Sequence, residues 1–154
     1  MQIIIFNVGF GSCAFLKTSN NKTVLFDCAS SEDFSPAHTL EFWGINKEKR
    51  LDKLIISHPH NDHISGLTDV RKLNNPRMLQ RNKGAIIDKL LPQSNERTES
   101  LKSFLDMNDS YNSKISASDE AEPITNWGDV LIKSFSCKPE HIDATSFNDM
   151  NNLS

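Results

Sequence analysis

The sequence lacks any apolar run that approaches the ~20 residues needed by a membrane-spanning helix. Residues 1–6 also lack the basic segment and the small-residue cleavage site of a signal peptide. These absences predict no membrane span and make the cytoplasm the expected location. No internal repeat and no linker divides the 154 residues, a length that suits one domain with its own core.

Cysteine is scarce, since the chain has only Cys13, Cys28 and Cys137. An odd count at wide, irregular spacing is typical of free thiols in a core rather than of a disulfide framework or a cysteine zinc site. A strong net charge is absent too, because the formal value is −3. This argues against a protein that coats nucleic acid, although a local basic groove stays open.

The charge is unevenly spread, with a basic stretch at 71–89 and an acidic one at 96–122. Such runs are usually solvated faces, and we interpret both in that way. The alternative for the basic stretch is a groove that contacts phosphates.

What the sequence does contain begins with short runs of strand type at 2–8, 13–18 and 23–28, separated by turn residues. They predict an antiparallel meander. Ser35-Pro36 then favours a helix start, and 51–57 returns to an apolar strand that lacks strict alternation. The resulting strand–helix–strand unit predicts a ligand site at the C-terminal end of its last strand.

The pattern weakens after residue 67. The expected elements are a helix at 65–73, a strand at 85–91, a helix at 95–107, a loop or insertion at 110–123, a strand at 127–135 and a polar tail at 138–154.

The strand at 51–57 leads directly into four candidate metal ligands, namely His58, His60, Asp62 and His63. Neutral imidazole and carboxylate suit zinc, and also manganese or iron. Side chains two apart in an extended loop can share one ion, so His58 and His60 are assigned to a first metal. Asp62 and His63, where the chain turns toward a helix, are assigned to a second.

Two divalent ions can deprotonate a bound water near neutral pH and polarise the bond under attack, so hydrolysis by a metal-bound hydroxide is the expected chemistry. Gly66 would let the following helix approach the sheet, with amide groups that can face an anion. A plain His-rich metal-binding tract is the competing interpretation. The cluster lies between an apolar strand and an apolar helix start, which favours a catalytic type of site.

The segment 58–63, His-Pro-His-Asn-Asp-His, resembles the His-x-His-x-Asp-His signature of the metallo-β-lactamase superfamily. Upstream, 7–12 resembles its opening glycine turn and 25–28 its first acidic motif. The closest likeness is to the branch that includes the soluble domain of the competence DNA-uptake protein ComEC, on the glycine turn, on 56–67 and on an Asn-x-x-Ser element at 151–154. The middle, about 70 to 145, matches nothing.

This resemblance implies an α/β fold, the four-layered αββα sandwich, of which the chain carries mainly the N-terminal half. It assigns His58 and His60 to the first metal and Asp62 and His63 to the second. It also gives Asp27 the role of a brace behind the metal loop.

Further candidate roles rest on this resemblance together with the basic stretch at 71–89. Asp62 is the candidate catalytic residue, and the candidate substrate contacts are Arg71, Lys72, Asn151 and Ser154. The ComEC-like features favour a phosphodiester, including one in nucleic acid, as substrate; lactones, thioesters and β-lactams are other substrates of the superfamily.

The sequence also departs from the superfamily pattern. By the same resemblance, the Gly-Asp element whose aspartate bridges the metals and a late histidine are expected beyond residue 154. His141 could stand in for a middle histidine, but its position favours a loop residue, and His38 is expected in solvent or core. We therefore interpret residues 1–154 as a single, incomplete domain that is weakly active or inactive unless a partner chain or C-terminal half completes it.

Two other classes of function remain open. The fold could serve as a non-catalytic binding module, or the chain could be an inactive truncated fragment. The intact set of first-half ligands favours the hydrolase.

Overall fold

A computed structural model describes residues 1–81, 91–112, 114–119 and 123–133 of the chain. The strands are β1 (Gln2–Ile5), β2 (Ala14–Lys17), β3 (Thr23–Phe26), β4 (Lys53–Ile56), β5 (Met78–Arg81) and β6 (Ser116–Ser118). The helices are α1 (Pro36–Phe42), α2 (Asn61–Ile64), α3 (Leu67–Leu73), the 3-10 turn η1 (Ser94–Glu96) and α5 (Glu99–Asp109).

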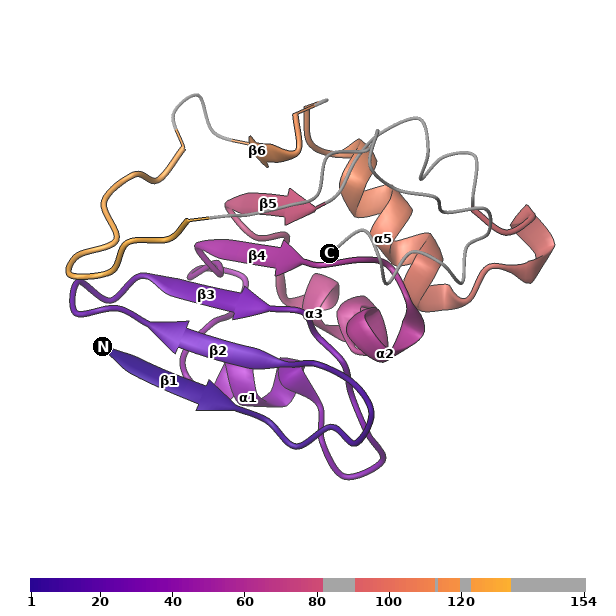
Figure 1. Cartoon of the computed structure of the whole chain (residues 1–154), viewed down its shortest axis with the longest axis horizontal. Coiled ribbons are helices and arrows are strands. Elements are labelled where there is room, and N and C mark those ends of the chain that lie inside the picture. The colour runs from indigo at the N-terminus through magenta and orange to yellow at the C-terminus, as the bar shows by residue number, and fades with distance from the viewer. Residues whose placement is uncertain (82–90, 113, 120–122, 134–154) are drawn as a thin grey trace.

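The six strands form one sheet in the order β1-β2-β3-β4-β5-β6 (Figure 1). β1, β2 and β3 pair antiparallel, which confirms the expected meander. β4 pairs parallel with both β3 and β5, and β6 closes the other edge in antiparallel register. Because β3 and β4 run in the same direction, their C-terminal ends lie side by side. The expected strand–helix–strand unit is confirmed, with α1 as its helix.

The α-helices of the described residues, α1, α2, α3 and α5, pack against one face of the sheet. Their buried side chains share a core cluster with inward-facing strand residues: Ala37 and Leu40 of α1, Ile64 of α2, Leu67 and Val70 of α3, and Leu101, Phe104 and Met107 of α5, against Phe15, Leu25, Leu54, Ile56 and Leu79. Phe15, Leu25, Leu54 and Leu79 are paired in register across the sheet, and Ile56 lies two positions after Leu54, so all five point to the same face. This helical face holds most of the core and supports the loops that follow β3 and β4.

The opposite face carries a smaller apolar cluster. Leu16, Val24 and Met78 pack there with Trp127, and the partly buried Ile124 and Val130 add to it. A non-sheet segment, 123–133, therefore covers part of this face. The mixed α/β architecture is consistent with the metallo-β-lactamase fold.

Several expected elements need correction. β5 forms at 78–81, where no strand was expected, and β6 lies inside the expected loop at 110–123. The strand expected at 127–135 is wrong for its described part, because residues 127–133 form no strand and instead lie across the sheet face through Trp127. The strand expected at 85–91 falls almost entirely on 82–90, outside the described residues.

The remaining expected helices are present. The helix at 65–73 forms as α3 after the short α2, and the helix at 95–107 forms as α5. In the part of the chain that the structure describes, no helix has both the length and the apolar character needed to cross a bilayer.

Candidate metal centre

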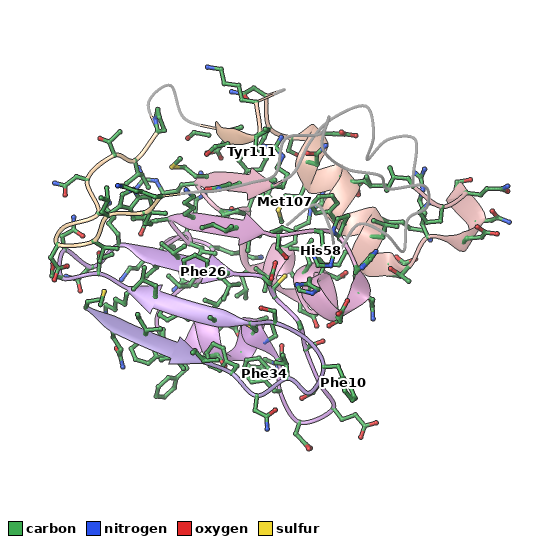
Figure 2. The ribbon with its side chains drawn as sticks, in the orientation of Figure 1. Phe10, Phe26, Phe34, His58, Met107 and Tyr111 are labelled. Atoms are coloured by element: carbon green, nitrogen blue, oxygen red, sulfur yellow. The ribbon has the colours of Figure 1, made fainter. Side chains whose placement is uncertain are left out.

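The candidate ligands leave the sheet at the C-terminal end of β4. His58 is the second residue after the end of β4 and is 3% exposed. His60 is the N-cap residue of α2, and Asp62 and His63 lie within that helix. Figure 2 shows His58 at the strand ends, close to the helical layer. The chain thus reverses from strand to helix within six residues, which brings side chains near in sequence onto one small region.

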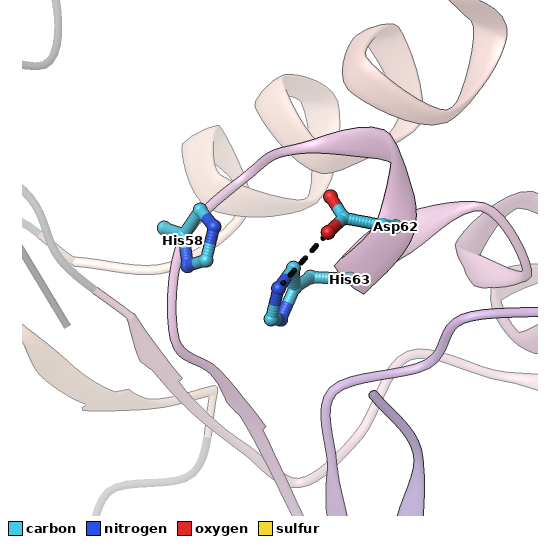
Figure 3. A group of neighbouring side chains, drawn as sticks. All are labelled: His58, Asp62 and His63. Carbon is cyan, nitrogen blue, oxygen red and sulfur yellow. Dashed lines mark ion pairs between the residues drawn. The ribbon is translucent and has the colours of Figure 1, made fainter. Parts of the chain in front are cut away.

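Three of the four expected ligands converge. One potential ligand atom from each of His58, Asp62 and His63 lies within 4.8 Å of the others (Figure 3). His63 Nε2 is 3.5 Å from Asp62 Oδ2. The ring of His60 is not in this group, but its centroid lies 4.7 Å from that of His58 in an edge-on contact. His60 is therefore adjacent to the group rather than within it.

The chemistry of these atoms fits a metal ion. His58 Nε2 is buried and has no hydrogen-bond partner among the described residues, a costly arrangement for a polar atom unless it faces a ligand. Burial, together with the neighbouring His63 and His60, lowers the pKa of His58 to about 4, against the opposing effect of Asp27 and Asp62. The imidazole is then neutral at pH 7, the form that coordinates metals.

Asp27 braces the cluster from β3. Its side chain is buried, and Oδ2 accepts a hydrogen bond from His63 Nδ1 at 2.8 Å while Oδ1 accepts one from the backbone N–H of Ser57 at 2.8 Å. Its φ of +50° places it in the left-handed region, which aspartate tolerates better than most residues. These contacts join Asp27 to the segment that carries the candidate ligands, and its role as a brace stays a prediction.

Ser57 is a site residue that the sequence interpretation missed. Its Oγ lies 3.0 and 3.1 Å from the two carboxylate oxygens of Asp27 and 3.1 Å from Nδ1 of both His58 and His63. In the sequence, Ser57 is the last position of the apolar strand expected at 51–57. Its position directly before the first histidine, with an aspartate at the end of a neighbouring strand, was the available signal.

Backbone contacts hold the loops together around the cluster. The amide of Ser12 donates to the carbonyl of Asp62 at 3.0 Å, and the amide of Cys28 donates to the carbonyl of His63 at 2.8 Å. A Cβ at Gly11 would lie 2.5 Å from the Asp62 carbonyl oxygen, so only glycine fits this approach. The turn between β1 and β2 and the residues after β3 therefore fix α2 in place.

Gly66 has the role expected for it. Its amide donates to the carbonyl of Cys28 at 2.8 Å, and an added Cβ would meet the ring of Pro36 at 2.6 Å and the same carbonyl oxygen at 2.8 Å. The start of α3 thus packs closely against the end of β3 and against α1.

The basic candidates Arg71 and Lys72 are engaged elsewhere. Arg71 Nη1 pairs with Asp106 of α5 at 3.1 Å, and Lys72 pairs with Asp69 of its own helix at 2.7 Å. Arg71 also lines a shallow surface hollow with Lys47. The structure does not bring either side chain into the histidine group, and their contact with substrate stays a prediction.

Other sequence candidates divide simply. Asn151, Ser154 and His141 lie outside the described residues, as does Cys137. His38 is exposed on α1, so of the two expected positions, solvent or core, the structure has the first. Cys13 and Cys28 are free and buried in the main core cluster, which confirms their interpretation as small core residues.

The class of protein that fold and site define is a mixed α/β protein with a His/Asp group able to hold a metal. Residues 6–77, a little under half of the chain, match the family model of the metallo-beta-lactamase superfamily. The match contains Asp27, Ser57 and the whole histidine cluster and ends directly before β5. A comparison with curated proteins finds no match.

Proposed function

We propose that the chain carries the metal-binding part of a metal-dependent hydrolase. The observation that carries the proposal is the convergence of His58, Asp62 and His63, with the buried Nε2 of His58 directed to no protein partner. The superfamily matched by residues 6–77 generally binds metal ions and suggests hydrolase activity in general.

The expected cofactor is a pair of divalent ions, zinc in the first place, with manganese or iron as alternatives. When bound, such ions supply Lewis acidity and a deprotonated water at neutral pH. The protein's own part is to hold the imidazoles of His58 and His63 through their Nδ1 atoms, which would leave Nε2 to face an ion. Asp62, 48% exposed at its side chain and next to His63, is positioned to bind an ion and to orient a water from solvent.

A phosphodiester, in nucleic acid or in a small molecule, is the proposed substrate class, on the strength of the ComEC-like motif. The described basic side chains give this extension no added support, since Arg71 is paired with Asp106 and Arg81 is 1% exposed. The single incomplete domain and the cytoplasmic location also stay predictions.

The test starts with metal content. Protein purified and titrated with zinc should bind about two equivalents if both proposed sites form, and His58→Ala and Asp62→Ala should lose most of this binding. His38→Ala is the matched control, because His38 is exposed on α1 and outside the cluster. No zinc binding at micromolar concentration in the unmodified chain would refute the proposal.

Activity is then measured on three probes: bis(p-nitrophenyl) phosphate, a single-stranded oligonucleotide and a p-nitrophenyl thioester analogue. Metal-dependent turnover of the phosphate probes, abolished by Asp62→Ala, supports a phosphodiesterase. Zinc binding without turnover of any probe, also in the presence of a longer chain of the same gene, favours the alternative of a non-catalytic binding module.

A further inference from the structure

Ser57 stands at the centre of the hydrogen bonds behind the proposed metal ligands. One hydroxyl lies within 3.1 Å of four acceptor or donor atoms, two on Asp27 and one on each of His58 and His63. A hydroxyl has one proton to donate and two lone pairs to accept with. The distribution of that single proton decides the state of both rings.

The carboxylate of Asp27 is the acceptor that claims this proton. A carboxylate cannot donate a hydrogen bond, and both oxygens of Asp27 lie near Ser57 Oγ. Hydrogen bonds to an ionised acceptor are stronger than those between neutral groups. Once Ser57 donates to Asp27, its oxygen can only accept from the histidines. Each Nδ1 that bonds Ser57 must then carry the hydrogen.

The two histidines differ in how they depend on Ser57. His63 Nδ1 also lies 2.8 Å from Asp27 Oδ2, so its hydrogen has a direct carboxylate acceptor. Among the described residues, His58 Nδ1 contacts Ser57 Oγ, at 3.1 Å. Ser57 is therefore the link through which the charge of Asp27 reaches the more deeply buried ring.

The geometry points to Ser57 as a positioning residue that holds His58 in the Nδ1–H form, so that its buried Nε2 presents a lone pair to the metal. This inference rests on the proposed function, because it concerns the same centre. It extends that function by naming a residue that touches neither metal nor substrate and acts through His58. A ring nitrogen that carries a hydrogen cannot bind a metal, so the wrong form of His58 blocks the centre.

The direct test reads the ring nitrogens in the metal-free protein. Long-range ¹H–¹⁵N NMR at pH 7.5 should show both His58 and His63 with hydrogen on Nδ1 in the unmodified chain. Ser57→Ala should release His58 into a mixture of both forms and leave His63 on Nδ1, since Asp27 still accepts from it. A purely structural serine would give no such difference between the two rings.

Metal affinity gives the second readout. Zinc competition with a chelator should show a loss of about 10–100-fold for Ser57→Ala, as is typical when a partner of a ligating histidine is removed. Ser57→Thr keeps the hydroxyl and should restore most of the affinity. Ser103→Ala removes a hydroxyl that bonds Thr68 between α3 and α5 and should change neither readout.

Two outcomes overturn the inference. One is His58 with hydrogen on Nε2 in the unmodified metal-free chain, which needs no variant to fold. The other is a Ser57→Ala protein that keeps His58 on Nδ1 and binds zinc within twofold of the unmodified chain. If the unmodified chain binds no zinc, the proposed function fails, while the NMR result still decides the role of Ser57.

Discussion

At the scale of single residues, Asp27 shows how a backbone conformation serves a site. Its φ of +50° comes directly after β3, and its amide still donates to Ile55 of β4 at 2.8 Å. The left-handed turn costs of order 1 kcal/mol. The side chain is thereby turned toward Ser57 and His63 instead of along the strand, which accounts for a strained conformation at this position.

We predict that Asp27→Asn weakens zinc binding by about 10–100-fold, with the fold retained. Asparagine has the same size and also tolerates the left-handed region. Its amide group, however, cannot accept from both the Ser57 amide and His63 Nδ1. Isothermal titration calorimetry measures the change. Asp69→Asn, on the exposed part of α3, is the control, and equal affinity of the two variants would contradict the prediction.

A second residue-scale prediction concerns alkaline pH. Burial, and secondly the charge of Asp27, raises the pKa of the Cys13 thiol to about 12, and burial raises that of Cys28. Free thiols in an unfolded chain titrate near 8.5. Above that value the unfolded state loses protons that the folded state keeps, so the free energy of unfolding should fall progressively as pH rises toward 12.

Urea unfolding at pH 7.5, 9.0 and 10.5 measures this fall. The double variant Cys13→Ala and Cys28→Ala should be less stable at pH 7.5, because it removes buried atoms, yet should lose less stability between pH 7.5 and 10.5. An identical loss in both proteins would show that the two thiols do not cause it.

How far the sequence predicts the site is visible at this same scale. Residue type and spacing predict the four candidate ligands, of which the structure brings His58, Asp62 and His63 together, whereas the role of Asp27 comes from the family resemblance alone. Ser57 is not predicted, because one serine at the end of a strand has many ordinary uses. Ser57 Oγ comes close to four polar atoms, on Asp27, His58 and His63, because the ends of β3 and β4 lie side by side in the fold.

At the scale of elements, the loops around the site depend on close backbone approach. The turn between β1 and β2 contacts α2 through the hydrogen bond from Ser12 to the Asp62 carbonyl, and Gly11 leaves the room for it. A turn at the sheet edge thus helps to hold a ligand that belongs to a different element.

Gly11→Ala should destabilise the fold by about 1–3 kcal/mol, since the added methyl group meets backbone and the Ala29 side chain. It should also weaken zinc binding by displacing Asp62. Gly9→Ala is the matched comparison: Gly9 has a φ of +71° but open space around its Cβ position. That variant should lose about 1–2 kcal/mol and keep its zinc affinity. Equal zinc affinity of the two variants would disprove the coupling between this turn and the metal centre.

The elements also show where sequence patterns are insufficient. β5 contains Gln80 and Arg81 and no β-branched residue, so its pattern does not indicate a strand. Arg81 is nevertheless buried, with its guanidinium donating to Asn108 and to the carbonyls of Asn112 and Ile115. Those partners come from α5 and the segment after it. The strand therefore depends on contacts at long sequence distance, which local periodicity cannot reveal.

At Trp127 the sequence pattern indicates a strand that does not form. The run from Trp127 to Lys133 has strand composition, but in the structure it packs on the face of an existing sheet. Trp127 covers Met78 and lies near Lys53, whose ammonium is 5.9 Å from the ring centroid. The apolar composition of these residues indicates that they are buried. It does not indicate whether they are buried by pairing as a strand or by packing on the face of a sheet.

At the scale of the whole molecule, β1 is an edge strand with two large apolar side chains in solvent. Ile3 is 59% exposed and Ile5 81% exposed. Both lie on the face opposite the helices, because Ile3 is paired with Leu16 of the smaller cluster. β1 has no charged residue or proline, the usual features that protect an edge from association.

We therefore predict concentration-dependent association of this chain. Light scattering coupled to size-exclusion chromatography between 5 and 200 μM, roughly the range in which exposed edges and apolar patches cause association, should show a rising mean mass. Ile5→Lys should reduce it without loss of zinc binding. Phe42→Lys is the control, because Phe42 of α1 is 87% exposed and lies on the helical side. A similar reduction by both variants would argue against an edge-specific association.

The parallel pairing of β3 with β4 has a last consequence, for the time course of hydrogen exchange. Asp27 and Ser57 directly follow these two strands, and the amide of Asp27 is itself a rung of the ladder they form. Opening this pair separates the aspartate from the serine and both rings, so the centre cannot persist through such an opening. An ion bound only to the closed state would then slow hydrogen exchange at the amides of Asp27 and Ser57 by the same factor. α5 contributes no ligand, so the ion would slow exchange there only for amides that exchange through unfolding of the whole domain.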